Sequence, residues 1–95
     1  MEIIEQIQSW YAAQCNGDWE HQYGISIETL DNPGWSVIVD LFGTNLEDIR
    51  FQAYQEDKGE DDWIFCEVNR GKFIGRGSPG KLQTMLEIFV GLIEK

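Results

Sequence analysis

The side chains best suited to chemistry lie close together after the first predicted helix. Cys15, Asp18, Glu20 and His21 fall within seven residues and supply a thiol, two carboxylates and the chain's single imidazole. A cysteine beside a histidine base is the arrangement of a thiol nucleophile. The same four side chains are all zinc-ligand types. This cluster therefore raises two hypotheses, a small enzyme and a metal-binding domain.

The spacing within the cluster matches neither chemistry. Structural zinc sites use paired cysteines or histidines at short fixed intervals, and the sequence contains neither C-x-x-C nor H-x-x-x-H. The acidic stretch at 56–62 lacks the ligand order of a calcium loop, and the glycines at 71–80 do not form a phosphate-binding sequence. We expect no catalytic residues, no metal and no cofactor. An enzyme or metal-binding domain built on the cluster remains the alternative to a binding function.

The charge balance favours a protein partner over other ligands. Seventeen acidic and seven basic side chains give a net charge of −10, which repels nucleic acid and anionic lipid and attracts cationic surfaces. The N-terminal sequence does not resemble a secretory signal, and no apolar run approaches the roughly 18 residues of a membrane span. We expect cytoplasmic residence, free thiols at Cys15 and Cys66, and neither nucleic acid nor membrane as a ligand.

Hydrophobic periodicity predicts a helix at each end of the chain. Apolar side chains recur at helical spacing over residues 2–15 and again over residues 79–94. The second helix is preceded by Ser78-Pro79, in which serine is a good N-cap and proline suits the first helical position.

Between the helices the hydrophobic period changes to two, which is typical of strands. The predicted strands are one from Tyr23 that turns at Asp31–Gly34, one over 35–42, a weaker one over 51–54, one over 63–68 and a short one over 73–75. Glycines and cations around the last strand favour an exposed sheet edge. We predict an α+β fold, a single domain over residues 1–95, with an antiparallel sheet of about five strands in a meander and both helices packed against it.

Three segments place a tryptophan in or beside a predicted loop, at Trp19, Trp35 and Trp63. Protein interfaces favour tryptophan and tyrosine, and acidic loops steer a basic partner toward them. Trp35 and Trp63 occupy strand positions where burial is expected, whereas Trp19 fits the core and the surface equally well. The candidate partner-binding residues are Asp18, Trp19, Glu20, Asp57, Glu60, Asp61 and Asp62.

Two long segments carry a resemblance to a known family. They are Trp10-Tyr11-x-x-Gln14-Cys15-Asn16-Gly17-Asp18-Trp19-Glu20-His21-x-Tyr23-Gly24-Ile25 and Thr29-Leu30-Asp31-Asn32-Pro33-Gly34-Trp35. They resemble the immunity protein 53 family of bacterial polymorphic-toxin systems, and the resemblance continues through Asp40-Leu41 and Asp61-Asp62-Trp63 to the closing helix. It implies an α+β immunity domain that neutralises a toxin by direct binding, without catalytic residues. A cationic toxin, such as a basic nuclease, would suit the charge of this chain.

Overall fold

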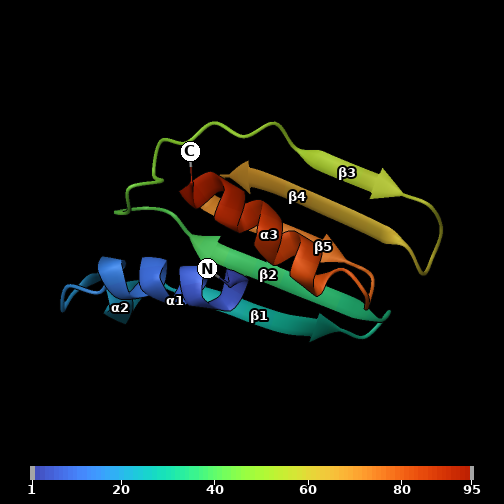
Figure 1. The fold of residues 1–95 in the computed structure, drawn as a ribbon, viewed down its shortest axis with the longest axis horizontal. Helices are drawn as coiled ribbons and strands as arrows, with labels where there is room; N and C mark the ends of the chain where they lie inside the picture. Colours follow the sequence, from blue (N-terminus) through green and yellow to red (C-terminus); the bar gives the residue numbers. More distant parts are fainter. Residues whose placement is uncertain (1, 95) are drawn as a thin grey trace.

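The computed structural model describes residues 2–94 as one antiparallel sheet with two long helices on the same face (Figure 1). The elements are α1 (Ile3–Gln14), α2 (Trp19–Gln22), β1 (Ile25–Leu30), β2 (Gly34–Asp40), β3 (Tyr54–Asp57), β4 (Trp63–Asn69), β5 (Lys72–Gly77) and α3 (Leu82–Ile93). The predicted α+β class, with five antiparallel strands and a helix at each end, is confirmed. Within residues 2–94 no helix is long and apolar enough to cross a membrane.

The sheet joins two runs of consecutive antiparallel strands. β1 and β2 form one hairpin, while β3, β4 and β5 pair in sequence, and the two runs meet where β2 pairs with β5. The strand order is therefore β1-β2-β5-β4-β3, and the prediction that the last strand forms an exposed edge is wrong. Its glycines serve helix packing instead. A Cβ added at Gly75 would lie only 3.0 Å from Met85 Sδ of α3, so a small residue lets this helix approach the central strand.

The core lies between the sheet and the two long helices. Phe73 on central β5 is fully buried, and its ring centroid lies 6.4 Å from that of Phe51 and 5.4 Å from that of Phe89 on α3. Trp10 of α1 meets Phe89 edge to face at 5.2 Å, and its indole N–H donates to Asn45 Oδ1 at 2.9 Å. This chain of rings connects both helices to the middle of the sheet.

Two predictions about strand ends are corrected. The weaker strand begins at Tyr54 and extends to Asp57, because Glu56 and Asp57 pair with β4 residues instead of lying in a loop. Phe51 lies outside the strand and packs on the core ring of Phe73. In the first hairpin, Gly34 is already paired with a β1 residue, so it belongs to β2 and not to the turn.

The predicted helix cap at Ser78 is also wrong. α3 begins at Leu82, and Ser78 is a buried residue, only 1% exposed, that bonds to the start of β4. The Trp63 N–H donates to Ser78 Oγ at 3.2 Å, the hydroxyl donates to the Trp63 carbonyl at 3.3 Å, and the Ser78 N–H donates to the same carbonyl at 3.0 Å. Ser78 thus attaches the β5–α3 connection to the neighbouring strand.

Replacing Ser78 with alanine should lower the free energy of unfolding by about 1–2 kcal/mol, because the half-buried Trp63 N–H loses its acceptor. Urea denaturation followed by tryptophan fluorescence measures this loss. Ser26→Ala, at an exposed position on β1, is the control and should change stability by less than about 0.5 kcal/mol. Equal urea midpoints for the two variants would contradict the role given to Ser78.

Candidate partner-binding surface

Asn16 and Glu20 shape the corner between α1 and α2. Asn16 Oδ1 accepts hydrogen bonds from the N–H groups of Asp18 and Trp19, both at 2.9 Å. The Glu20 carboxylate accepts in return from the N–H groups of Asn16 at 2.9 Å and Gly17 at 2.7 Å. Gly17 has a φ of +91°, which side-chain-bearing residues rarely adopt. These local bonds reverse the chain and turn Trp19 toward the core.

The same bonds engage part of the predicted chemical cluster. Hydrogen bonds from the backbone N–H of Glu20 itself, and then from those of Asn16 and Gly17, hold the pKa of Glu20 below its ordinary value. Cys15 is exposed and its thiol donates to the Tyr11 carbonyl at 3.4 Å. Over residues 2–94, no group of three or more His, Cys, Asp or Glu side chains is placed to hold a metal. Two of the four residues in the predicted cluster, Cys15 and Glu20, are thus hydrogen-bonded to backbone groups of this corner.

Trp19 is a core residue, whereas its sequence context fitted a core position and a surface position equally well. Its side chain is 5% exposed and its Nε1–H donates to the Phe42 carbonyl at 2.9 Å. The indole contacts three other rings, with centroids 6.3 Å away at Trp10, 6.0 Å at Tyr11 and 6.2 Å at Tyr23. Trp19 therefore packs beneath surface residues and is not itself accessible to a partner.

Three aromatic side chains around Trp19 do reach the surface, and we call Tyr11, Tyr23 and Phe42 the aromatic patch. Tyr11 is 37% exposed, Phe42 is 57% exposed, and half-buried Tyr23 lies 5.6 Å from Phe42 between ring centroids. A depression of about 340 Å³ adjoins the patch between α1 and β1. It is lined by Ile7, Gln8, Tyr11, Gly24 and Ile25.

The seven candidate residues named from the sequence do not include this patch, although two features of the sequence indicate that these rings face outward. Tyr11 follows Trp10 directly in a helix, and neighbouring helical residues do not face the same way, so one of the two had to turn outward. Phe42 follows Leu41, which is fully buried directly after β2, so continued alternation places Phe42 on the opposite side.

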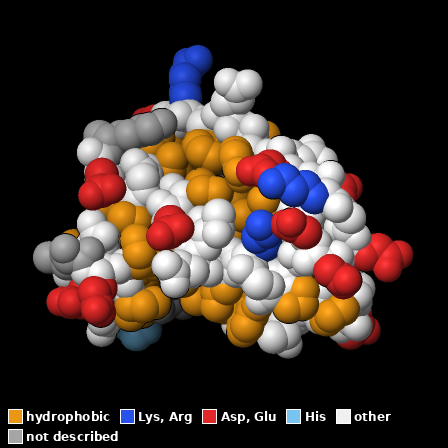
Figure 2. Space-filling view, turned by 45° about the vertical axis from the view of Figure 1, so that its right-hand side comes forward, with side chains coloured by type: hydrophobic (Ala, Val, Ile, Leu, Met, Phe, Trp, Pro, Cys, Tyr) orange, Lys and Arg blue, Asp and Glu red, His pale blue; other side chains and the backbone are white. Residues whose placement is uncertain are grey.

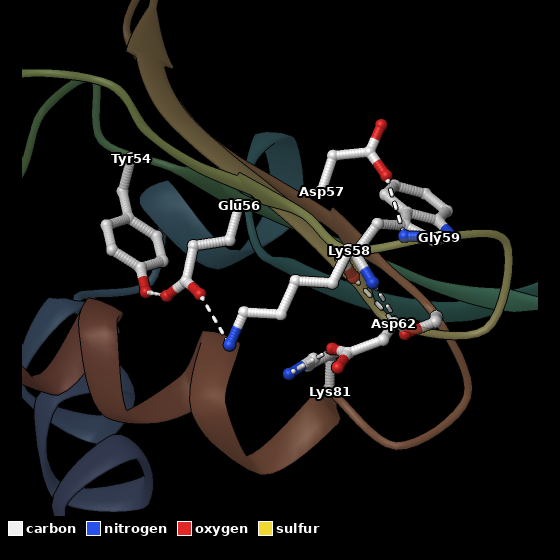
Figure 3. A network of polar contacts seen from close by, with 9 residues as sticks. Tyr54, Glu56, Asp57, Lys58, Gly59, Asp62 and Lys81 are labelled. Atoms are coloured by element: carbon white, nitrogen blue, oxygen red, sulfur yellow. Dashed lines mark hydrogen bonds and ion pairs between the residues drawn. The ribbon is translucent and has the colours of Figure 1, made fainter.

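The second predicted acidic group surrounds the loop between β3 and β4. Asp62 pairs with Lys81 at 2.9 Å, and this bond lowers the pKa of Asp62 and raises that of Lys81 (Figure 3). Asp57 Oδ1 accepts from the backbone N–H of Gly59 at 3.2 Å. Glu60 and Asp61 are exposed.

Cations accompany the acids at this end of the molecule. Lys58 lies 3.4 Å from Glu56, whose carboxylate also accepts the Tyr54 hydroxyl; the Tyr54 bond, and then the lysine, lower the pKa of Glu56 (Figure 3). Figure 2, turned so that this end comes forward, shows acidic and basic side chains interleaved. The negative charge of the β3–β4 loop is therefore partly compensated locally.

The structure does not bring the two acidic groups together. The corner at α2 and the β3–β4 loop lie at opposite ends of the long dimension of a molecule that measures 42 × 28 × 24 Å (Figure 1). Asp18, Trp19 and Glu20 thus belong to one end, and Asp57, Glu60, Asp61 and Asp62 belong to the other. The seven predicted residues therefore divide between two separate ends of the molecule, of which only the α2 end adjoins the aromatic patch.

Comparison with known proteins bears on which function these surfaces serve. Neither the curated proteins nor the solved structures contain a match. The family model described as Immunity protein 53 matches residues 4–94, from α1 to the residue after α3, which confirms the resemblance inferred from the sequence. The chain belongs to the immunity protein 53 family.

Proposed function

We propose that this chain is an immunity protein that binds a cognate polymorphic toxin and neutralises it by steric and electrostatic occlusion. Membership of the family over residues 4–94 is the observation that carries the proposal. The proposal includes a cytoplasmic, non-catalytic protein whose partner is a basic toxin, such as a nuclease. The net charge of −10 and the exposed aromatic rings support that partner chemistry.

The charge would act before contact is made. A strongly acidic protein attracts a cationic partner over a distance of about one Debye length, and such steering can raise association rates toward about 10⁸–10⁹ M⁻¹s⁻¹. Fast capture suits a protein that must stop a toxin before damage accumulates. Among the predicted contact residues, the exposed carboxylates at Asp18, Asp57, Glu60 and Asp61 would contribute most to this field. The charge of Asp62 is already compensated by Lys81 within the chain.

The test is capture of the toxin-domain product of the neighbouring reading frame by the tagged chain, at low and at high salt. We expect stoichiometric capture, association that slows as salt rises, and protection of cells that express both proteins. The product of an unrelated toxin gene serves as the specificity control. If no neighbouring product is captured at either salt concentration and co-expression gives no protection, the proposed function is wrong.

A further inference from the structure

We propose that the aromatic patch, Tyr11, Tyr23 and Phe42, is the docking surface for the toxin, and that it receives a toxin surface rich in arginine and lysine. This inference rests on the proposed function and specifies which end of the molecule performs it.

The first observation is that the rings of the aromatic patch are exposed and are already held in place by contacts with other rings. Phe42 is 57% exposed, the largest exposed fraction among the large hydrophobic side chains described, and Tyr11 is 37% exposed. Tyr11 and Tyr23 contact the ring of buried Trp19, and Phe42 contacts Tyr23. Rigid aromatic side chains lose little conformational entropy on binding, and interface hot spots are enriched in such residues.

The second observation is where the net charge lies along the chain. Residues 1–49 contain nine Asp or Glu and neither Lys nor Arg, whereas residues 50–95 contain all seven Lys and Arg and the other eight acidic residues. Three of these acids lie at the patch: Asp18 and Glu20 flank Trp19, and Glu47 accepts a hydrogen bond from the N–H of Gly43, next to Phe42, at 2.6 Å. The turn between β1 and β2, which contains Asp31, lies instead beside Glu60 and Asp61 at the other end of the molecule.

Within residues 2–94 none of the three carboxylates at the patch is in an ion pair, whereas Asp40 close by is paired with Lys72 at 3.0 Å. Negative charge next to aromatic rings favours guanidinium and ammonium groups, which bind aromatic faces as well as carboxylates.

The β3–β4 end also carries exposed carboxylates, but it has one exposed ring where the α2 end has two. Lys58 and Lys81 lie within 4 Å of acidic partners there and compensate part of its charge. Its exposed ring, Tyr54, lies on an edge strand, and its hydroxyl donates to Glu56. The structure therefore favours the α2 end for docking, while charges at the β3–β4 loop add to the long-range attraction.

A substitution at Gly24, which lines the depression beside Tyr11, can block this surface without removing an existing contact. A Cβ added at Gly24 meets no atom within 4 Å, and Gly24 does not have the positive φ that excludes side chains. Its N–H donates to Asp40 Oδ2 at 2.9 Å and its carbonyl accepts from the Asp40 N–H at 3.0 Å. Both bonds use backbone atoms of Gly24, so Gly24→Arg should fold and place a bulky cation in the depression.

Gly80 provides the matched control at the other end of the molecule. A Cβ there also meets no atom within 4 Å, so Gly80→Arg makes the same change in charge and size near the β3–β4 loop. Tyr54→Ala is the corresponding control for Tyr11→Ala, because both tyrosines are 37% exposed. Ile4→Ala, at 56% exposure on α1, is the control for Phe42→Ala.

The experiment measures the Kd of each variant for the captured toxin domain by calorimetry, after urea denaturation has shown that each is folded. We expect Phe42→Ala, Tyr11→Ala and Gly24→Arg each to weaken binding about tenfold or more, and the three controls to stay within about threefold of wild type. Wild-type affinity in the patch variants would overturn the docking assignment while leaving the proposed function standing. Loss of affinity in Gly80→Arg and Tyr54→Ala alone would overturn it in favour of the β3–β4 end. Failure of the wild-type chain to bind would overturn the proposed function itself.

Discussion

Phe73→Ala should lower the free energy of unfolding by about 3–5 kcal/mol, the largest stability loss expected from one substitution in this chain. Phe73 is fully buried on the central strand, and its ring contacts Phe51 from the long connection and Phe89 from α3. Removing the ring leaves a cavity between these neighbours, which the surrounding structure fills only in part. Natural domains have a total stability of about 5–15 kcal/mol, so a large fraction of the variant should unfold.

Urea denaturation followed by fluorescence and by circular dichroism measures the effect. Phe42→Ala is the matched control, because the same ring is removed from a side chain that is 57% exposed. We expect that control to change stability by about 0.5 kcal/mol or less. If Phe73→Ala and Phe42→Ala unfold at the same urea concentration, the arrangement of the core described above is wrong.

Trp19→Ala should have the second-largest effect, and it should act on stability and on binding together. Removal of a buried indole costs about 3–5 kcal/mol, and here it also leaves the Phe42 carbonyl without its donor. Tyr11 and Tyr23 would lose the ring on which they rest. We therefore expect the folded fraction of this variant to bind the toxin at least about tenfold more weakly, although Trp19 does not reach the surface.

Trp35 provides a control that separates the two effects. Its indole N–H donates to the Pro79 carbonyl at 2.9 Å, a bond of the same length and kind as that of Trp19, at the start of β2. Trp35→Ala should lower the urea midpoint but leave the Kd of the folded fraction unchanged. If Trp19→Ala weakens toxin binding no more than Trp35→Ala does, then Trp19 only stabilises the fold and does not position the aromatic patch.

Long-range attraction and docking need not use the same residues. The field of a protein sums over all its charges, so the β3–β4 loop contributes to steering wherever the toxin finally binds. Docking depends on side chains that exclude water and fit closely, and at the α2 end these are aromatic. Salt should therefore change mainly the association rate, and substitutions in the aromatic patch should change mainly the dissociation rate.

The sequence predicted what depends on residues close together in the chain. Apolar side chains at helical spacing indicated α1 and α3, and alternation indicated β1 and β2, because both signals require only the local repeat of a helix or strand. The order of helix, strands and helix then led to the α+β class. The segments around Trp19 and Trp35 were sufficient to indicate the family, which the match over residues 4–94 confirms.

Tertiary structure alone decided what depends on partners far apart in the chain. Glycines and cations suggested an edge for β5, yet pairing with both β2 and β4 places it in the centre, where Gly75 lets Met85 approach. Likewise, Trp19 is buried among the rings of Trp10, Tyr11 and Tyr23. Its indole donates to the carbonyl of Phe42, 23 residues later, whose own ring is exposed. Burial is a property of the packed arrangement, so the sequence could predict that aromatic residues cluster near α2 but not which of them a partner can reach.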